Sequence, residues 1–428
     1  MRRYPGLRRR RFLGSLLGAV AAPSVISSGV LGGPRPAPSG RITMGFVGLG
    51  WKGFAGCWGS LLQGFIADPR CQVLAVCDVD RHYRDRAKAF VDQTYGDSAC
   101  AVYRDFRDLV ARPDLEAVAI AAPDHWHAVQ TIWACRHGKD VYCEKPLALT
   151  IREARAMVQA ARRYGRIVQT GSQSRSMGGL KFACDVVRSG RIGKVVEVHV
   201  ACGGPSVPCP LPAQPVPDSL DWDLWLGPAP WRPFHSQIHP VAFRAWYDYS
   251  GGGMTDWGCH HFDLAQWALG KDDTGPVEII PPDGRQHPWL TYRYADGVRV
   301  YHSSPDITKG VAVIGTEGKV WMFGVAASTR FEPASLARTH IRREETIAGE
   351  NDVGNRSHTQ NFLESVRTRR RPNADVEIGC RTLSVCLLGN IAYQLRRPLR
   401  WDPLQETFVG DAEADRHLDR ARREPWNI

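Results

Sequence analysis

The chain has 428 residues, of which 43% are hydrophobic and 23% charged, and this near-average composition excludes wholesale disorder, collagen and coiled coil. The net charge of +11 does not indicate nucleic-acid binding, because six arginines without neighbouring acids lie in the first 33 residues and leave +5 for the rest. No basic stripe or nucleic-acid motif follows. A chain of this length is expected to form two or three domains.

The N-terminus is typical of an export signal. The sequence R-R-R-F-L at residues 9–13 matches the twin-arginine pattern, and a weakly apolar run rich in glycine and alanine follows it. We interpret residues 1–33 as a signal read by the twin-arginine export machinery, and residues 34–40 as a disordered linker. The mature protein is then expected in the periplasm. The apolar run is too short and interrupted for a stable membrane anchor; a basic tail kept in the cytoplasm is the alternative.

Residues 41–171 are expected to form an α/β domain with a doubly wound parallel sheet. Short, continuously apolar segments alternate with helical stretches such as Ala128–Cys135 and Ile151–Tyr164, a pattern typical of a parallel sheet covered on both faces. The expected strands are Ile42–Val47, Gln72–Cys77, Val118–Ala121, Asp140–Cys143 and Ile167–Thr170.

Residues 172–405 are expected to form an α+β domain with a largely antiparallel sheet, and residues 406–428 a C-terminal tail. A helix at Leu180–Ser189 leads into an alternating strand, and strand-like pairs farther on flank glycine-bearing turns. The segment Gly203–Ser250 holds ten of the 29 prolines and four tryptophans. So much tryptophan argues against disorder, so we interpret this segment as an ordered loop that covers a site.

The twelve cysteines do not predict a metal site, because no C-x-x-C occurs and the spacings are irregular. Cys202 and Cys209 flank a loop and could pair in an oxidising compartment, but free thiols are the favoured interpretation.

A dinucleotide-binding turn follows the first strand. Gly48, Gly50 and Gly53 form G-x-G-x-x-G with Leu49 in the first x position, directly after a strand and opening a helix, where backbone N–H groups can face a pyrophosphate. Asp78 ends the next strand, where its carboxylate can accept from both ribose hydroxyls. It would repel a 2′-phosphate, which favours NAD, with NADP the alternative.

Two further motifs carry reactive groups. Glu144-Lys145-Pro146 follows the strand Asp140–Cys143, where the lysine can donate to a substrate hydroxyl and discourage protonation of a nearby histidine. Asp256 and His260 are spaced i, i+4 in a helix expected to run from a glycine turn to Gly270. Near a helix N-terminus the imidazole stays neutral and basic. A capping Asp with a packed His, or an Asp-His-His metal site with His261, are the alternatives.

These motifs, in this order, resemble the glucose–fructose oxidoreductase / inositol dehydrogenase (Gfo/Idh/MocA) family over residues 42 to 400. The resemblance implies a Rossmann domain that binds NAD or NADP and an open-faced antiparallel sheet domain that binds a sugar or cyclitol. It also implies that Lys145 holds the substrate hydroxyl, that His260 is the acid/base and that Asp256 is its partner.

The resemblance adds residues around the cofactor and substrate. Pro123, Asp124, His125 and His127 match a T-P-x-x-x-H loop against the cofactor, although Ala122 replaces the threonine. Glu144, Lys145 and Gln173 are also expected at the cofactor. Weaker candidates for the substrate wall are Arg175, Trp231, Arg232, Arg244 and Trp246.

The sequence therefore predicts an exported, two-domain oxidoreductase that moves a hydride between a secondary hydroxyl of a sugar or sugar derivative and a tightly held NAD. One alternative is a glycoside hydrolase that uses NAD to form a transient keto sugar, and another is a non-catalytic sugar-binding protein on the same fold. The open sheet face is a plausible surface for forming a homo-oligomer.

Overall fold

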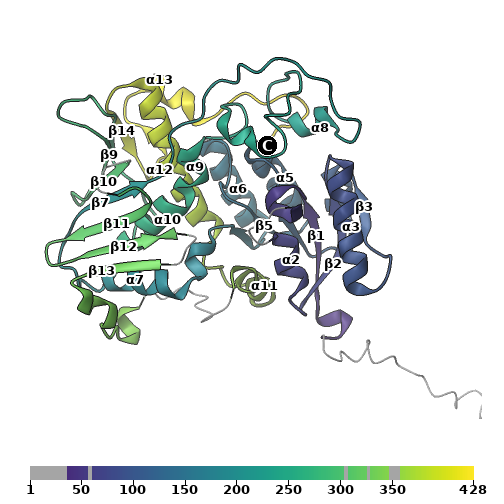
Figure 1. Ribbon diagram of the computed structural model, residues 1–428, viewed down its shortest axis with the longest axis horizontal. Coiled ribbons are helices and arrows are strands. Elements are labelled where there is room, and N and C mark those ends of the chain that lie inside the picture. The colour runs from purple at the N-terminus through teal and green to yellow at the C-terminus, as the bar shows by residue number, and fades with distance from the viewer. Residues whose placement is uncertain (1–35, 56–59, 303–306, 325–327, 347–356) are drawn as a thin grey trace, which may run out of the picture. The chain divides into compact units, whose positions relative to one another are not determined.

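The computed structural model describes residues 36–55, 60–302, 307–324, 328–346 and 357–428 (Figure 1). The expected export signal at residues 1–33 lies outside them. Contacts divide the chain into Met1–Arg41 and Ile42–Ile428, and the second unit holds both sheets. Within the described part of the chain, no helix combines the length and apolar character needed to cross a membrane.

Six parallel strands form the first sheet, in the order β3-β2-β1-β4-β5-β6. Nearly every residue of β1, β4 and β5 is buried, as their continuous apolar sequences predict. The strand order reverses between β1 and β4, which opens a crevice for a ligand at the carboxyl ends of these strands. The strands are β1 (Ile42–Val47), β2 (Cys71–Cys77), β3 (Ala101–Tyr103), β4 (Ala117–Ile120), β5 (Asp140–Cys143) and β6 (Val168–Thr170).

Helices cover both faces of this sheet. The helix expected to begin at the glycine turn is interrupted: a π-helical turn occupies Trp51–Ala55, and α2 begins at Leu61. Thr150 and Glu153 form a capping box at the start of α6. The helices are α2 (Leu61–Ile66), α3 (Arg81–Tyr95), α4 (Phe106–Val110), α5 (Asp124–Arg136) and α6 (Ile151–Arg163).

The second sheet has nine strands in the order β13-β12-β11-β7-β10-β9-β8-β14-β15. Its neighbours pair antiparallel except β7 and β10, which pair in parallel, so the expectation of a largely antiparallel sheet is confirmed. The strands are β7 (Val195–Ala201), β8 (Glu278–Ile280), β9 (Leu290–Arg293), β10 (Arg299–His302), β11 (Gly310–Gly315), β12 (Lys319–Phe323), β13 (Ser328–Glu332), β14 (Leu399–Asp402) and β15 (Thr407–Phe408).

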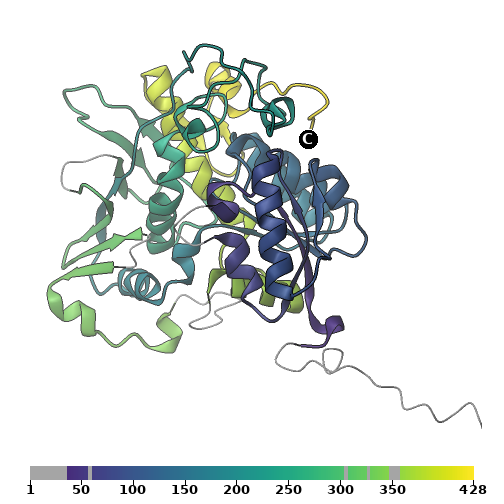
Figure 2. The same ribbon diagram turned by 45° about the vertical axis from the view of Figure 1, so that its right-hand side comes forward.

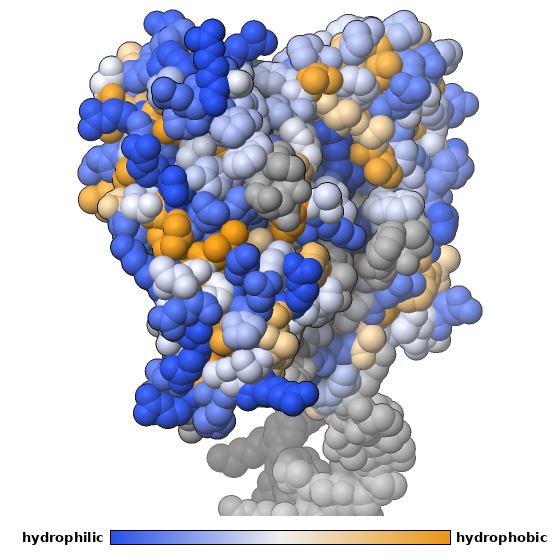
Figure 3. All heavy atoms as spheres, turned by 60° about the vertical axis from the view of Figure 1, so that its left-hand side comes forward, coloured by the Kyte–Doolittle hydropathy of each residue, from blue (hydrophilic) through white to orange (hydrophobic). Residues whose placement is uncertain are grey.

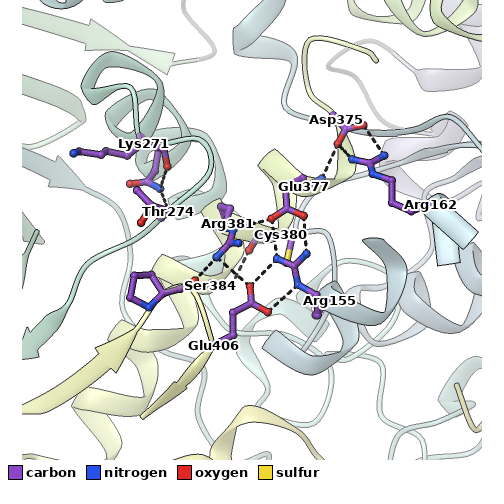
Figure 4. A network of polar contacts seen from close by, with 12 residues as sticks. Arg155, Arg162, Lys271, Thr274, Asp375, Glu377, Cys380, Arg381, Ser384 and Glu406 are labelled. Atoms are coloured by element: carbon purple, nitrogen blue, oxygen red, sulfur yellow. Dashed lines mark hydrogen bonds and ion pairs between the residues drawn. The ribbon is translucent and has the colours of Figure 1, made fainter. Parts of the chain in front are cut away.

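Helices α10 and α12 lie between the two sheets, next to α6 of the first (Figure 1). Ion pairs lock this junction: Arg155 of α6 bonds Glu377 of α12 at 2.6 Å and Glu406 at 2.7 Å (Figure 4). Residues 406–428, expected to be a tail, pack into the core through Trp426. The remaining helices are α7 (Gly178–Arg188), α8 (Trp222–Leu226), α9 (Gly253–Asp256), α10 (Gly258–Leu269), α11 (His358–Thr368), α12 (Val376–Leu395) and α13 (Ala412–Asp415).

The segment 203–250 is ordered, as its tryptophans predict. Trp222 and Trp225 of α8 stack with centroids 4.7 Å apart inside a small apolar cluster of the segment's own residues. Backbone hydrogen bonds join the segment to the chain that follows β2. The N–H of Arg81 donates to the carbonyl of Ser219 at 2.9 Å. Figures 1 and 2 both show the teal segment that carries α8 above β1 and α3. Cys202 and Cys209 are free thiols.

Candidate active site

The glycine turn after β1 is shaped to receive a dinucleotide. Gly48 has a φ of 82°, and a Cβ at Gly53 would lie 1.9 Å from the Gly48 carbonyl oxygen, so both positions require glycine. A Cβ at Gly50 would meet nothing within 4 Å and would project into open space. That space lets a pyrophosphate approach the backbone, so the residues present fit NAD.

Asp78 closes the far side of this turn. Its carboxylate accepts from the N–H of Leu49 at 2.6 Å and from the N–H of Asp80 at 2.8 Å. Burial raises the pKa of Asp78 to about 6, against the opposing effect of these two bonds. The side chain of Leu49 is buried in the core, so this residue contributes to the pocket through its backbone N–H, which holds the Asp78 carboxylate.

A pocket runs from the glycine turn past Asp78, and its other wall comes from the segment 203–250. A carboxylate at the end of β2 marks the adenosine half of a Rossmann site. The segment thus forms a roof over that half, which the sequence predicted only as cover for an unspecified site. The roof residues that line the pocket are Leu224, Trp225, His239, Pro240, Phe243 and Arg244.

The roof is pinned to the first domain at α5. The Trp225 carbonyl accepts from Trp126 Nε1 at 2.9 Å and lies 3.0 Å from His125 Nε2. Gly227 has a φ of 48°, and a Cβ there would lie 2.0 Å from the Trp126 ring. Arg423 Nε donates to the Gly227 carbonyl at 2.9 Å, so the C-terminal segment holds the same turn.

Only part of the expected 123–127 loop faces the cofactor pocket. Pro123 lines the pocket, whereas His125 and His127 lie behind its wall. Burial lowers the pKa of His125 to about 4, so its neutral ring serves to hold the roof. The ring nitrogens of His127 lie 2.7 Å from the Pro146 carbonyl and 2.8 Å from that of Ala122. These two histidines therefore position loops, and neither lines this pocket.

Lys145 and Asp256 meet across the two domains. Lys145 Nζ lies 2.5 Å from Asp256 Oδ1 and 2.9 Å from the Asp256 backbone oxygen. That oxygen is available because the expected single helix is broken at Trp257: the N–H of His260 bonds the Trp257 carbonyl instead. The site thus lies between α9 and α10, where the helix ladder is interrupted.

Asp256 stays a carboxylate in this setting. Burial by itself would raise its pKa, but Lys145 and Arg244 outweigh burial and hold the pKa below the ordinary value. Arg244 Nε lies 3.3 Å from Asp256 Oδ1. Among the described residues no hydrogen bond joins Asp256 to His260, so Asp256 orients Lys145 rather than the imidazole ring.

His260 is a neutral, buried base. His260 is only 4% exposed, and its Nδ1 atom has no hydrogen-bond partner in the described part of the chain. Burial lowers the pKa of His260 well below its ordinary value, and the charge of Lys145 lowers it further. His261 differs, since its Nδ1 lies 2.5 Å from the Ala201 carbonyl, which makes it structural.

Further buried polar atoms that lack a hydrogen-bond partner among the described residues lie around the carboxyl ends of β4, β5 and β6. They are Asp124 Oδ2, Glu144 Oε1 and Gln173 Oε1. Buried polar groups are ordinarily hydrogen-bonded, so these atoms indicate a place for a ligand. Lys52 Nζ lies 3.8 Å from Glu144 Oε1. The resemblance to the family places Asp124 in the loop expected against the cofactor; burial raises its pKa to about 6.

Arg175 is not part of a substrate wall. Its guanidinium is buried between Asp263, at 2.9 Å, and Asp272, at 2.7 Å, and lies over the Trp267 ring. Two carboxylates already occupy its donors, so it holds α10 in place.

The other residues expected in the substrate wall also differ in what their side chains contact. Arg232 donates to the carbonyls of Cys209 and Leu211 and stabilises the roof. Trp246 bonds the Gln237 carbonyl, and Trp231 is 65% exposed, with neither lining the cofactor pocket. Arg244 alone reaches the Lys145–Asp256 pair. Within the described residues, no cluster of three or more His, Cys, Asp or Glu side chains is placed to hold a metal ion.

Comparison with known proteins matches both domains. Residues 42–172 match the oxidoreductase family's NAD-binding Rossmann fold, and residues 207–428 match its C-terminal alpha/beta domain. The chain is 40% identical over 227 residues to 1,5-anhydro-D-fructose reductase of Ensifer adhaerens, covering 50% of this chain and 58% of that protein. It is 36% identical over 129 residues to inositol 2-dehydrogenase of Salmonella typhimurium, covering 30% and 37%.

A third relative is 2,7-anhydro-N-acetylneuraminate hydratase of Mediterraneibacter gnavus, 36% identical over 105 residues, or 24% of this chain and 28% of that protein. The chain thus spans between 28% and 58% of the length of these three relatives. Among solved structures, aldose-aldose oxidoreductase from Caulobacter crescentus shares the fold with a TM-score of 0.58 at 19% identity, covering 84% of this chain and 99% of that one. The chain belongs to the Gfo/Idh/MocA family of oxidoreductases, with an NAD-binding Rossmann domain and a C-terminal alpha/beta domain.

Proposed function

We propose that the protein transfers a hydride between a secondary hydroxyl of a sugar or sugar derivative and NAD. The observation that carries this proposal is the pair Lys145–Asp256, joined at 2.5 Å beside the neutral His260 at the carboxyl edge of the NAD-binding sheet. A cationic donor and an uncharged base together suit a hydroxyl that loses its proton. The names of the sugar- and inositol-acting relatives point to the same substrate class.

Each residue has a distinct role in this reaction. Lys145 donates a hydrogen bond to the substrate hydroxyl and stabilises the alkoxide charge that develops on its oxygen. The imidazole of His260 accepts the hydroxyl proton. Asp256 and Arg244 keep Lys145 in place, and Gln173 and Glu144 offer buried acceptors at the nicotinamide end. Bound NAD supplies the acceptor for the hydride of the carbon that bears the hydroxyl.

The roof supports a tightly held cofactor. Because the roof is hydrogen-bonded to α5 and to the chain after β2, we expect these contacts to slow the departure of NAD. We therefore propose that the hydride returns before product leaves, either to a second sugar or to the same sugar. The second route would make the protein a glycoside hydrolase that forms a transient keto sugar, adding water after elimination. The relative named a hydratase supports such a redox-neutral cycle.

Export by the twin-arginine pathway would fit a retained cofactor, because that pathway carries folded proteins and little free NAD is expected outside the cytoplasm. Replacing Arg9 and Arg10 by lysine should trap the full-length precursor inside the cell. Mature protein recovered from the periplasm after that double change would contradict the proposed localisation.

The outer face of the nine-stranded sheet is the surface we propose for a homo-oligomer. Tyr301, His199, Ala312, Trp321 and Arg330 are register neighbours along one row across the strands, and the Arg330 guanidinium lies 3.6 Å from the Trp321 ring centroid. Figure 3, seen from this side of the molecule, shows apolar side chains gathered among hydrophilic ones. Sedimentation of the purified protein tests this; a monomer at all concentrations would contradict it.

A screen of glycosides and free sugars against the purified protein tests the proposed reaction. Both nicotinamide absorbance and released products are followed. Oxidised or reduced sugar indicates an oxidoreductase, and a released aglycone with unchanged net cofactor redox state indicates the hydrolase. Binding of sugars without any turnover would support instead the non-catalytic alternative, which the intact Lys145, Asp256 and His260 argue against.

A further inference from the structure

A second cavity lies at the C-terminal end of α12, and none of the residues that line it lines the NAD pocket. Its volume is about 540 Å³, within the range of small-molecule sites. The start of α6, residues 205–208, the last turns of α12 and residues 417–420 line it. Leu387, Ile391 and Pro205 supply apolar wall, whereas its charged groups are all basic.

Arg420 is the unusual member of this wall. Its guanidinium carbon lies 3.7 Å from the centroid of the Tyr247 ring, and Nη1 donates to the Tyr247 carbonyl at 2.5 Å. No carboxylate of the described residues lies within 4.0 Å of this guanidinium. Burial lowers the pKa of Arg420, and the nearby Tyr247, Glu153 and Asp248 do not offset that effect.

The missing partner does not reflect a shortage of acids in this region. Arg422 forms ion pairs with both Glu153, at 3.1 Å, and Asp419, at 2.6 Å. Other arginines nearby are also paired with carboxylates, as Figure 4 shows for Arg155 and Arg381. A buried guanidinium costs free energy unless an anion accompanies it. The structure therefore leaves one cationic position whose counter-charge the described residues do not supply.

Two more basic groups border the same cavity. Arg396 follows the last residue of α12 and is exposed, and His417 is half-buried. Neither forms an ion pair with a carboxylate in the described part of the chain. Three basic side chains and an apolar wall thus face one space.

We propose that this cavity binds a small organic molecule bearing a carboxylate or a phosphate group. Arg420, Arg396 and His417 hold the oxyanion through charge-assisted hydrogen bonds, and Leu387 and Ile391 contact its carbon skeleton. The site is independent of the proposed hydride transfer, because none of its residues belongs to the Lys145–His260 site or to the NAD pocket.

Isothermal titration of the mature protein at constant ionic strength tests the proposal with three probes: inorganic phosphate, glucuronate and the neutral glucose. We expect phosphate or glucuronate to bind with a Kd below about 10 mM. The substitution Arg420→Met keeps the apolar stem and should weaken that binding at least about tenfold. The control Arg416→Met, at an exposed arginine outside the cavity, should change nothing.

Phosphate and sugars can also enter the NAD and substrate pockets. Only binding that is lost in Arg420→Met is therefore assigned to the second cavity. Loss for phosphate alone would assign a phosphate site, and loss for glucuronate alone a carboxylate site. Arg396→Met, at an exposed position that does not endanger folding, should weaken the same probe. Equal affinities in wild type and Arg420→Met, or no oxyanion binding below 10 mM, would overturn the proposal.

Discussion

His260 is the side chain on which the proposed reaction depends most, and its substitution gives the first prediction. His260→Gln keeps a similar volume but removes the base, so turnover should fall at least about 100-fold. Affinity for NAD should stay nearly unchanged, because the glycine turn and Asp78 are untouched. Steady-state kinetics and NAD titration check both. A variant that keeps more than half of the wild-type turnover would remove His260 from the mechanism.

In the proposed mechanism Lys145 donates to the substrate, and its charge also contributes to keeping His260 neutral. Burial and the Lys145 charge both lower the pKa of His260, so the ring is neutral throughout the neutral pH range. In Lys145→Met the charge is gone, the protonated ring costs less, and the pKa of His260 should rise. Titration of the ring by NMR measures this directly. An unchanged or lower pKa would show that Lys145 does not act on His260.

Asp78 gives the third prediction, on cofactor choice. Asp78→Ser should weaken NAD binding and relax discrimination against NADP, because the ribose contact and the repulsion of the 2′-phosphate are both lost. The pKa of Asp78 is about 6, so wild-type discrimination should weaken as the pH falls through that value and the carboxylate becomes neutral. In Asp78→Ser this pH-dependent part of the discrimination against NADP should be absent, because no carboxylate is left at this position. Unchanged affinities for both cofactors would exclude Asp78 from the site.

At the scale of single residues the sequence predicts best where one local motif holds the information. The glycine turn, Asp78 and Lys145 could be placed because each follows a recognisable strand. Arg175 and His125 could not, because their partners, Asp263 and the Trp225 carbonyl, lie about 90 to 100 residues away in the chain. Side-chain partners that come from another element are set by tertiary packing, which no local pattern reports.

The roof over the NAD pocket is held against α5 at the turn that contains Gly227. A Cβ at Gly227 would lie 2.0 Å from the Trp126 ring, and its positive φ disfavours any side chain. Gly227→Ala should therefore loosen α8 from α5 and speed the loss of NAD on dilution by about tenfold or more, if the displaced contact is worth about 1.4 kcal/mol.

Gly204→Ala is the matched control for the roof, because it lies in the same segment and a Cβ there would meet nothing within 4 Å. It should release NAD at the wild-type rate. Equal release rates in Gly227→Ala and wild type, with both proteins folded, would mean that the roof does not retain the cofactor.

Among the elements, five of the six strands of the first sheet could be predicted to within about two residues, because strands buried on both faces are continuously apolar. The short edge strand β3 was not predicted, and its three residues are only half-buried. The break at Trp257 could not be predicted from the helical spacing, and the Asp256 carbonyl that it leaves free is bonded by Lys145 from another domain. The parallel pairing of β7 with β10 is likewise a property of the assembled sheet. The tryptophan-rich segment could be predicted to be ordered, but not that it lies over the NAD pocket.

For the molecule as a whole, the two domains and the C-terminal segment act as one support for the site. Arg155 joins α6 to Glu377 and Glu406, and Arg423 of the C-terminal segment holds the turn at Gly227. The segment 406–428 looked like a tail in sequence because it lacks a long apolar helix, yet it stabilises the roof. The proposed retention of the cofactor should therefore depend on both domains and on the C-terminal segment.

The cofactor content of the purified mature protein tests this central claim most directly. After gentle purification without added NAD, acid release and chromatography measure the nucleotide bound per chain, and sustained turnover is followed in cofactor-free buffer. We predict NAD or NADH at a substantial fraction of the sites, and multiple turnovers without addition. A protein that purifies empty, and works only when NAD is supplied in large excess, would contradict the retained cofactor and indicate an ordinary dehydrogenase.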